Sequence, residues 1–393
     1  MAGPGTAPKA PANTTMAVFL LIFFLLLTGY GILIDYYRRA WNAIPGADAG
    51  AGRQPAVSVV VAVRNEAGNI PRLLHDLYLQ DYPKPLYEVI VVDDHSTDGT
   101  MQQVQANNYP GMALRSLALP EALTSKKSAI AAGVDIASGE MILTTDADCR
   151  MGPGWIAAMA NAYTERQAQC IAAPVRMEGK RSLAGLFQML DFLTLQGITG
   201  ASVYKRFHSM CNGANLAYSK AAFEAVDGFS GIDTIPSGDD MLLMHKIYLR
   251  YPSAVIYLKN SQAIVTTATE PSWKSFLHQR IRWASKAVHY NDRRIRYVLM
   301  LVYATNLCFL VLGLASVGRA SWLMFWLLFL LAKIIIEFPF VNAVAKFFGQ
   351  SSLMMYFPFF QPLHILYTIV AGWLGRFGSY QWKSRTIQNT DRL

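Results

Sequence analysis

Long apolar segments near both ends of the chain constrain its fold most strongly. The first runs from Met16 to Ile34, and three more cover about residues 298–317, 321–344 and 353–375. A helix of about 20 apolar residues is long enough to span a bilayer, and it satisfies its own backbone hydrogen bonds there. Charged residues make up only 16% of the chain, against about 25% in a typical soluble protein. The sequence therefore predicts an integral membrane protein whose middle part faces water.

These segments predict the order of the domains. Residues 16–37 are expected to form a transmembrane helix, and residues 55–271 a cytosolic domain. An amphipathic interface helix is expected over 272–297, because its apolar residues recur at helical spacing among basic ones. Two to three transmembrane helices follow within 298–376. A disordered tail is expected over residues 1–15, a linker over 38–54 and a basic tail over 377–393.

Basic residues flank the apolar segments instead of forming one long run. Arg38 and Arg39 follow the first segment, so the positive-inside rule predicts an outside N-terminus and a cytosolic middle domain. The net charge of +9 suits the anionic headgroups of membrane lipids, and the absence of a recognisable nucleic-acid-binding module argues against a nucleic-acid partner. The four cysteines show no paired spacing, which agrees with a reducing compartment. The predicted location is a bacterial inner or plasma membrane.

Two of the carboxy-terminal segments contain residues that are unusual in a membrane. Lys333 and Glu337 stand at i, i+4 spacing, and we interpret them as an internal structural pair. The last segment carries Pro358, Pro362 and His364 and is a candidate for a kinked or re-entrant helix. Three full spans would leave the C-terminus outside, whereas the basic residues that follow favour the inside, and the sequence leaves both alternatives open.

The middle of the chain alternates between predicted strands and helices. Apolar runs at 57–63, 87–92 and 142–145 are typical of buried parallel strands, and amphipathic helices are expected between them. A further strand is expected near 112–117, and a buried or interfacial helix over 183–203. This alternation predicts an α/β domain with a mostly parallel sheet.

Paired carboxylates follow two of the predicted strands. Asp146 and Asp148 come directly after the third apolar run, and Asp93 and Asp94 come after the second. In open α/β sheets, ligands bind outside the carboxyl ends of the strands. Carboxylate oxygens suit a hard cation that takes its other ligands from substrate phosphates, so the sequence predicts an Asp-X-Asp site for Mg²⁺ or Mn²⁺ and a diphosphate.

The order of the motifs resembles that of a known enzyme family. Val61 to Glu66, Val92 to Asp98, Asp146-Ala-Asp148, Gly238-Asp239-Asp240 and Gln279-Arg-Ile-Arg282-Trp283 together resemble the family-2 group of processive-type glycosyltransferases. That group has the Rossmann-like GT-A fold and includes cellulose, hyaluronan and chitin-oligosaccharide synthases and ceramide glucosyltransferase. The resemblance covers about residues 55–290. One departure is Asp239, which stands where the family usually has Glu; the negative charge is kept.

The resemblance implies a role for each motif. Asp93 and Asp94 would contact the nucleobase and ribose of a UDP-sugar, and Asp148, helped by Asp146, would hold the metal at the diphosphate. Asp240 would be the general base that takes the proton of the acceptor hydroxyl. The remaining implied contacts are with the diphosphate or the acceptor entrance: Lys127 or its neighbour Lys126, Gln279, Arg282 and Trp283.

The chemistry of glycosyl transfer independently requires these residue types. Inversion at the sugar carbon needs a carboxylate within hydrogen-bond reach of the attacking hydroxyl. The departing diphosphate needs neutralisation by a divalent metal and by a cation such as Arg282, whose planar fork matches phosphate oxygens. Trp283 offers a flat face for a sugar ring, although anchoring at the membrane interface is the alternative.

The sequence therefore predicts an inverting, metal-dependent hexosyltransferase with a UDP-sugar donor and a membrane-associated acceptor. That acceptor is a growing polysaccharide or a lipid; in the lipid case the enzyme would be a single-transfer glycolipid synthase. An alternative of another class is a membrane transporter with a nucleotide-binding domain, although no paired repeat of spans is visible.

Overall fold

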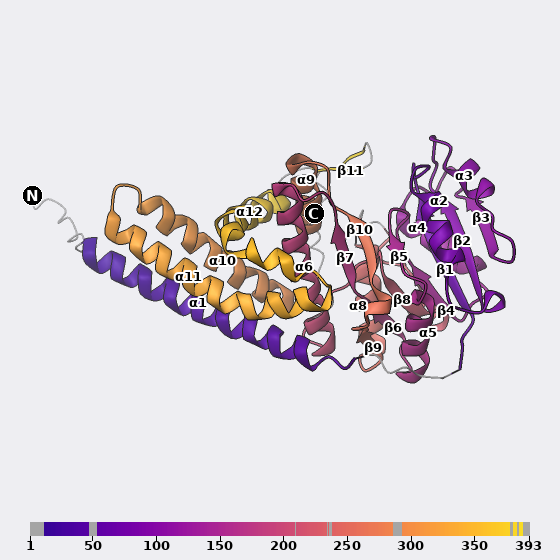
Figure 1. The fold of residues 1–393 in the computed structure, drawn as a ribbon, viewed down its shortest axis with the longest axis horizontal. Coiled ribbons are helices and arrows are strands. Elements are labelled where there is room, and N and C mark those ends of the chain that lie inside the picture. Colours follow the sequence, from indigo (N-terminus) through magenta and orange to yellow (C-terminus); the bar gives the residue numbers. More distant parts are fainter. Residues whose placement is uncertain are drawn as a thin grey trace, which may run out of the picture.

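The computed structural model describes residues 12–46, 53–208, 210–233, 235, 238–285, 293–377, 380–382 and 385–387. The molecule is elongated, with an α/β domain at one end and a bundle of long helices at the other (Figure 1). The predicted fold class, a mostly parallel α/β domain with long apolar helices on both sides of it in the sequence, is confirmed.

The central sheet of the domain has seven strands in the order β3-β2-β1-β4-β8-β6-β9. Neighbouring strands are parallel except at β8, which runs antiparallel to both β4 and β6. The Val- and Ile-rich strands β1 and β2 are almost wholly buried, as expected for a sheet covered on both faces. The strands are β1 (Val57–Val63), β2 (Tyr87–Asp93), β3 (Ala113–Ala118), β4 (Met141–Thr144), β6 (Cys170–Ala172), β8 (Leu216–Ser219) and β9 (Val255–Tyr257).

Short helices accompany the sheet, and those between β1, β2 and β4 lie where the sequence predicts helices. The helix α4 packs closely on β1 and β2 because it carries Gly133, where an added Cβ would lie 2.4 Å from a methyl group of Val60. Ser125 begins α4 by accepting a hydrogen bond from the backbone N–H of Ser128 at 3.0 Å. The helices are α2 (Ile70–Tyr78), α3 (Thr100–Ala106), α4 (Lys126–Ile136), α5 (Trp155–Glu165), α7 (Lys220–Ala225) and α8 (Asp239–Arg250).

A long buried helix joins the domain to the bundle. This helix, α6 (Leu183–Tyr204), packs against β7 and β9 on the domain side and against α1 and α11 on the bundle side. The sequence left a buried or an interfacial helix open here, and the structure shows a mostly buried one. A second sheet lies beside it, with strand order β5-β10-β7 and bounds Arg150–Met151, Val265–Ala268 and Val175–Glu178.

The first helix, α1 (Ala12–Ala43), is longer at both ends than the span expected over 16–37. It continues through the expected linker because Asp35 pairs with Arg38 and Arg39, at 2.7 and 2.6 Å, one turn further on. The side chain of Trp41 is then buried against the domain, where Lys259 donates a hydrogen bond to its carbonyl oxygen at 2.9 Å. Residues 1–11 of the expected tail and 47–52 of the linker lie outside the described residues.

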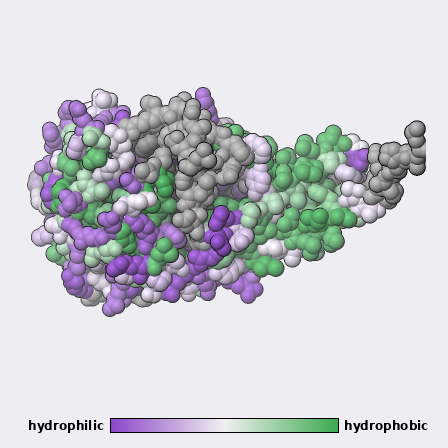
Figure 2. Space-filling view, turned by 180° about the vertical axis from the view of Figure 1, so that it is seen from behind, coloured by the Kyte–Doolittle hydropathy of each residue, from purple (hydrophilic) through white to green (hydrophobic). Residues whose placement is uncertain are grey.

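The bundle presents apolar side chains outward, as Figure 2 shows. Three of its helices, α1, α10 (Arg293–Ala315) and α11 (Ala320–Phe347), pack on one another. The ring of Phe23 is fully buried between them, with its centroid 4.7 Å from that of Phe309 and 4.3 Å from that of Phe329. In the described part of the chain, four helices are long and apolar enough to cross a membrane: Thr14–Ala43, Arg293–Ala315, Ala320–Phe347 and Phe357–Gly375.

The expected interface helix over 272–297 is shorter than predicted. It corresponds to α9 (Trp273–Ser285), whereas residues 293–297 already belong to α10, and residues 286–292 lie outside the described residues. The boundary was misjudged because three of the first four residues of α10 are arginines, which a hydropathy pattern counts as water-exposed. One of them, Arg294, donates to the carbonyl oxygen of Arg206 at 3.0 Å, which ties the start of α10 to the end of α6.

The last helix, α12 (Phe357–Phe377), lies beside the domain-side part of the bundle and away from the turn between α10 and α11 (Figure 1). A short 3₁₀ helix, Ser351–Met355, precedes α12 and contacts α6. Arg181, two residues before the start of α6, donates to the hydroxyl of Ser352 in this 3₁₀ helix at 3.1 Å. The hairpin that follows α12, β11 (Tyr380–Trp382) with β12 (Arg385–Ile387), contacts α9. Both flanks of α12 therefore adjoin elements of the domain side.

We expect the chain after α12 to lie on the same side of the membrane as the α/β domain. A single cysteine at Asn389, in a variant whose four native cysteines are replaced, should react with a membrane-impermeant maleimide only in vesicles that expose the domain. Glu121→Cys, in the domain, should react in the same vesicles. Val317→Cys lies between α10 and α11, where the native side chain is 80% exposed, and should react only in vesicles of the opposite orientation. Co-labelling of positions 389 and 317 would contradict this topology.

Candidate active site

The predicted acids follow strands that end at one edge of the central sheet. Val63 of β1 pairs with Asp93 of β2, and β1 also pairs in parallel with β4, so the three strands end together. β1 has β2 on one side and β4 on the other, and open α/β sheets bind their ligands at such a point of reversal. Two of the three acidic clusters are thereby brought to one edge.

The loop after β4 presents two carboxylates. Asp146 and Asp148, with the thiol of Cys149, have potential ligand atoms within 4.8 Å of one another. Burial raises the pKa of Cys149 well above its usual value, so its thiol is neutral and a poor ligand. Arg150 anchors the end of this loop through a forked pair with Asp76, at 2.5 and 2.7 Å. The two carboxylates therefore fit a hard divalent cation that shares its remaining coordination with phosphate oxygens.

The proton affinity of Asp148 predicts how metal binding depends on pH. Desolvation by the surrounding protein atoms, with the neighbouring charges of Asp146 and Glu66, raises the pKa of the solvent-accessible Asp148 to about 6. Because a metal ligand must be deprotonated, protonation competes with the metal below that pH. We expect Mn²⁺ affinity, measured by calorimetry, to be about tenfold lower at pH 5 than at pH 7. Equal affinity at the two pH values would contradict the assignment.

Lys126 connects two acidic clusters that are far apart in the sequence. Its ammonium donates to Oδ1 of Asp146 at 2.6 Å and lies 3.5 Å from Oδ2 of Asp239. Burial alone would lower the pKa of Lys126, but the charges of Asp146 and Asp239 outweigh burial and raise it. The ammonium therefore stays charged and draws the start of α8 to the loop after β4.

Asp240 sits in the first turn of α8 and is held by two backbone N–H groups. Its Oδ2 accepts from Gly213 at 2.9 Å and its Oδ1 from Met241 at 2.8 Å. The helix begins after Gly238, whose φ of +87° is a conformation that favours glycine. An added Cβ on Gly213 would lie 3.3 Å from Cβ of Asp240 and 3.4 Å from Nζ of Lys126, so this glycine allows the loop to approach both.

The loop that carries Gly213 is fixed by Asn215. The side chain of Asn215 is fully buried, accepts from Nε1 of Trp155 at 2.9 Å, and donates to the carbonyl oxygens of Pro174 and Ala263 at 2.8 and 2.7 Å. The side chain of Asn215 therefore has a structural role.

Asp93 is the last residue of β2 and Asp94 follows it, as predicted. The two side chains lie in different environments. Asp93 accepts from the backbone N–H of Ser96 at 3.2 Å. Asp94 is 3% exposed, and Arg64 donates to its carbonyl oxygen at 2.7 Å and lies 3.5 Å from its Oδ1. That Oδ1 is a buried carboxylate oxygen without a hydrogen-bond partner in the structure. A buried acceptor in this state is costly, and a donor group of a ligand would satisfy it.

Lys127 has a different role from the phosphate contact that the resemblance implies. Its side chain is 5% exposed, and its ammonium donates to the carbonyl oxygens of Ile232, at 2.6 Å, and Ile235. It thereby holds the loop that leads to α8. Lys126, one residue earlier on α4, is the lysine that lies among the acids.

Gln279 and Trp283 of the motif on α9 contact residues outside the acidic clusters. Gln279 donates to Glu270 at 2.9 Å, and Trp283 packs on Phe192 of α6 with ring centroids 6.0 Å apart. Arg282 is half-buried in the last turn of α9. The motif thus lies at the junction of α6, α9 and α12, where α9 packs against α12.

Comparison with known proteins identifies the domain that carries the acids. Residues 58–226 match the model of glycosyl transferase family 2. The mannosyltransferase PcManGT from Pyrobaculum calidifontis, solved with GDP-Man and Mn²⁺, superposes with a TM-score of 0.61 at 20% identity, over 88% of this chain and 99% of that chain. Residues 58–226 are therefore similar to glycosyl transferase family 2, and the α/β domain has the GT-A fold, as the motifs predicted.

Two curated relatives extend the similarity beyond the matched domain. The probable glycosyltransferase YdaM of Bacillus subtilis is 25% identical over 285 residues, which cover 69% of this chain and 66% of YdaM. The beta-monoglucosyldiacylglycerol synthase of Nostoc sp. is 24% identical over 243 residues, 59% of this chain and 49% of the relative. The chain spans about half to two thirds of the length of these two relatives.

Proposed function

We propose that this protein is an inverting, divalent-metal-dependent glycosyltransferase that moves a hexose from a nucleotide sugar to a membrane-associated acceptor. The observation that carries the proposal is the position of Lys126 between Asp146 and Asp239. It brings the predicted metal site close to the start of α8, which carries the predicted base, Asp240.

Asp240 is the proposed general base. A base must lie within hydrogen-bond reach of the acceptor hydroxyl, and its orientation must be fixed for the attack to be in line. The N–H groups of Gly213 and Met241 orient the carboxylate of Asp240 in this way. The proton passes from the acceptor hydroxyl to this carboxylate as the hydroxyl oxygen attacks the anomeric carbon and the bond to the diphosphate breaks.

The donor would lie across the carboxyl edge of the sheet. Oδ1 of Asp94 accepts no hydrogen bond from the described residues, although Arg64 lies 3.5 Å away. This supports a contact with an N–H or O–H group of the nucleoside, and Asp93 adjoins it. Asp146 and Asp148 would hold Mg²⁺ or Mn²⁺, which neutralises charge on the departing diphosphate when bound. Lys126 adds a second positive charge there. We propose UDP as the nucleotide from the motif resemblance, with GDP as the alternative that the mannosyltransferase complex raises.

The motif on α9 would complete the site at the membrane. We propose that Gln279, Arg282 and Trp283 contact the diphosphate and the entering acceptor, as the family motif implies. The basic residues Arg38 and Arg39 at the end of α1 support a cytosolic position for the domain.

Among the two acceptor classes, the packing of the bundle favours a lipid. The described parts of α1, α10 and α11 pack directly, with Phe23, Phe309 and Phe340 completely buried. A polymer channel between these helices would need polar side chains facing an open path, and aromatic rings occupy that interface instead. A lipid reaches a site at the membrane surface by lateral diffusion and needs no such path.

Nucleotide release by the purified protein in lipid nanodiscs tests the activity. A panel of UDP- and GDP-hexoses with Mn²⁺ or Mg²⁺, repeated with added lipid extract, should give release with one donor that chelation abolishes. Silence with every donor and extract would contradict the proposal. Flux of a solute across vesicles without nucleotide release would instead support the transporter alternative.

A further inference from the structure

Arg280 stands inside the Gln-X-X-Arg-Trp motif at a position that the motif leaves unspecified, yet it is the most buried charged residue of α9. Its side chain is 2% exposed. Nε donates to Oδ2 of Asp191 on α6 at 2.8 Å, and Nη2 lies at the same distance from that oxygen. Burying a cation and a carboxylate is costly, so a pair of this kind persists only where its geometry is good.

The guanidinium of Arg280 also contacts two motif residues. Nη1 donates to Oε1 of Gln279 at 2.8 Å. The central carbon of the guanidinium lies 4.1 Å from the ring centroid of Trp283 and 4.7 Å from that of Phe276. Phe276 and Trp283 are four residues before and three after Arg280, so the three side chains are neighbours on one face of the helix. Arg280 therefore restrains both Gln279 and Trp283.

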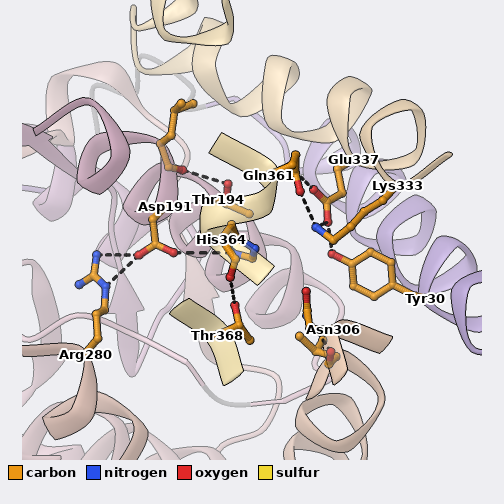
Figure 3. A network of polar contacts seen from close by, with 12 residues as sticks. Tyr30, Asp191, Thr194, Arg280, Asn306, Lys333, Glu337, Gln361, His364 and Thr368 are labelled. Atoms are coloured by element: carbon orange, nitrogen blue, oxygen red, sulfur yellow. Dashed lines mark hydrogen bonds and ion pairs between the residues drawn. The ribbon is translucent and has the colours of Figure 1, made fainter. Parts of the chain in front are cut away.

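Asp191 connects this face of α9 to the membrane part. Its Oδ1 lies 3.8 Å from Nε2 of His364 on α12, so one carboxylate stands between α9 and α12 (Figure 3). The side chain of Asp191 is only 5% exposed, and α6 itself packs on α1 and α11. The contact between Arg280 and Asp191 therefore holds α9 against α6, which packs on α1 and α11, and places it next to His364 of α12.

We propose that Arg280 is a positioning residue, which through Asp191 fixes Gln279 and Trp283 for the transfer reaction. The inference rests on the proposed function, because it takes those two motif residues to contact the donor or acceptor. Arg280 itself does not touch the reacting groups in this scheme. Arginine is required because its planar fork bonds the carboxylate and the amide while its faces stack on two rings, which a lysine ammonium cannot reproduce.

Arg280→Lys tests the proposal, since it keeps the charge and removes the fork and the stacking. We expect kcat for sugar transfer to fall about 10- to 100-fold while the Kd of Mn²⁺ and the nucleoside diphosphate stays within about twofold. Asp191→Asn, which nearly conserves the volume, should show the same split. Lys274→Gln, an exposed charge on the same helix, is the matched control and should keep wild-type kcat. Wild-type kcat in Arg280→Lys, or a loss proportional to the unfolded fraction, would overturn the inference.

Hydrogen exchange provides a readout that does not need activity. In Arg280→Lys the backbone amides of residues 279–285 should exchange at least about tenfold faster than in the wild type, with those of β1 and β2 unchanged. Unchanged protection of α9 would overturn the positioning role. If the wild type releases no nucleotide with any donor, the proposed function fails, while the exchange experiment still decides whether Arg280 orders the motif.

Discussion

Replacing Asp240 with asparagine is expected to lower sugar transfer about 1,000-fold, the typical contribution of a general base. Asparagine keeps the shape of the side chain and one acceptor oxygen for the N–H of Gly213 or Met241. It cannot take the proton of the acceptor hydroxyl. Because the metal ligands Asp146 and Asp148 are untouched, binding of Mn²⁺ and the nucleoside diphosphate, measured by calorimetry, should change by less than about threefold.

Two further variants show whether the loss of sugar transfer in Asp240→Asn arises at the chemical step. Asp227→Asn removes a carboxylate from the loop before α8 and should leave kcat unchanged. Asp148→Asn should weaken Mn²⁺ binding and transfer together, in contrast to Asp240→Asn. Transfer by Asp240→Asn within about tenfold of the wild type would exclude it as the general base.

Replacing Lys333 with methionine is expected to destabilise the membrane bundle by about 3–5 kcal/mol, as found when one partner of a buried ion pair is removed. Lys333 is completely buried and donates to Oε1 of Glu337 at 2.5 Å and to Oε1 of Gln361 at 2.6 Å. Gln361 returns a bond to Oε2 of Glu337 at 2.7 Å, and the hydroxyl of Tyr30 donates to Oε1 (Figure 3). Without Lys333, the hydrogen-bond partners left to Glu337 among the described residues are the neutral side chains of Tyr30 and Gln361.

The double variant Lys333→Met/Glu337→Gln should recover at least about half of that loss, because it removes both charges and keeps an acceptor for Tyr30. Lys346→Met, at an exposed position of the same helix, is the control and should be nearly neutral. Denaturant titration in detergent micelles measures the free energy of unfolding. Equal stability of Lys333→Met and Lys346→Met would contradict a structural role for the pair that the sequence predicted.

Much of the domain was predictable because its strands and acids are local features. The runs at β1, β2 and β4 are apolar enough to be read as buried strands, and each is followed directly by its polar residues. Parallel pairing then brings those residues to one edge without further information. The clusters Asp93/Asp94 and Asp146/Asp148 could therefore be placed from their positions after strands, whereas the proposed roles of the acids came from the resemblance.

The sequence could not predict contacts of side chains whose surroundings come from distant parts of the chain. Lys126 and Lys127 are neighbours on α4, and only the packing of α4 on the sheet decides which one faces the acids. Arg280 and Arg282 are equally basic in the sequence. The partner that buries Arg280 is Asp191, 89 positions away, and no local pattern announces it. The position of α12 likewise depends on its packing against α9 and α10.

The most direct test of the central claim follows the sugar itself. Wild-type protein and Asp240→Asn in nanodiscs containing lipid extract receive the radiolabelled nucleotide sugar that supports release, with Mn²⁺, and the lipid fraction is then separated by chromatography. The account predicts one labelled lipid carrying a single added hexose, formed by the wild type and nearly absent with Asp240→Asn. A ladder of products would contradict single transfer to a lipid, and label that stays in free sugar or nucleotide would contradict the transferase function.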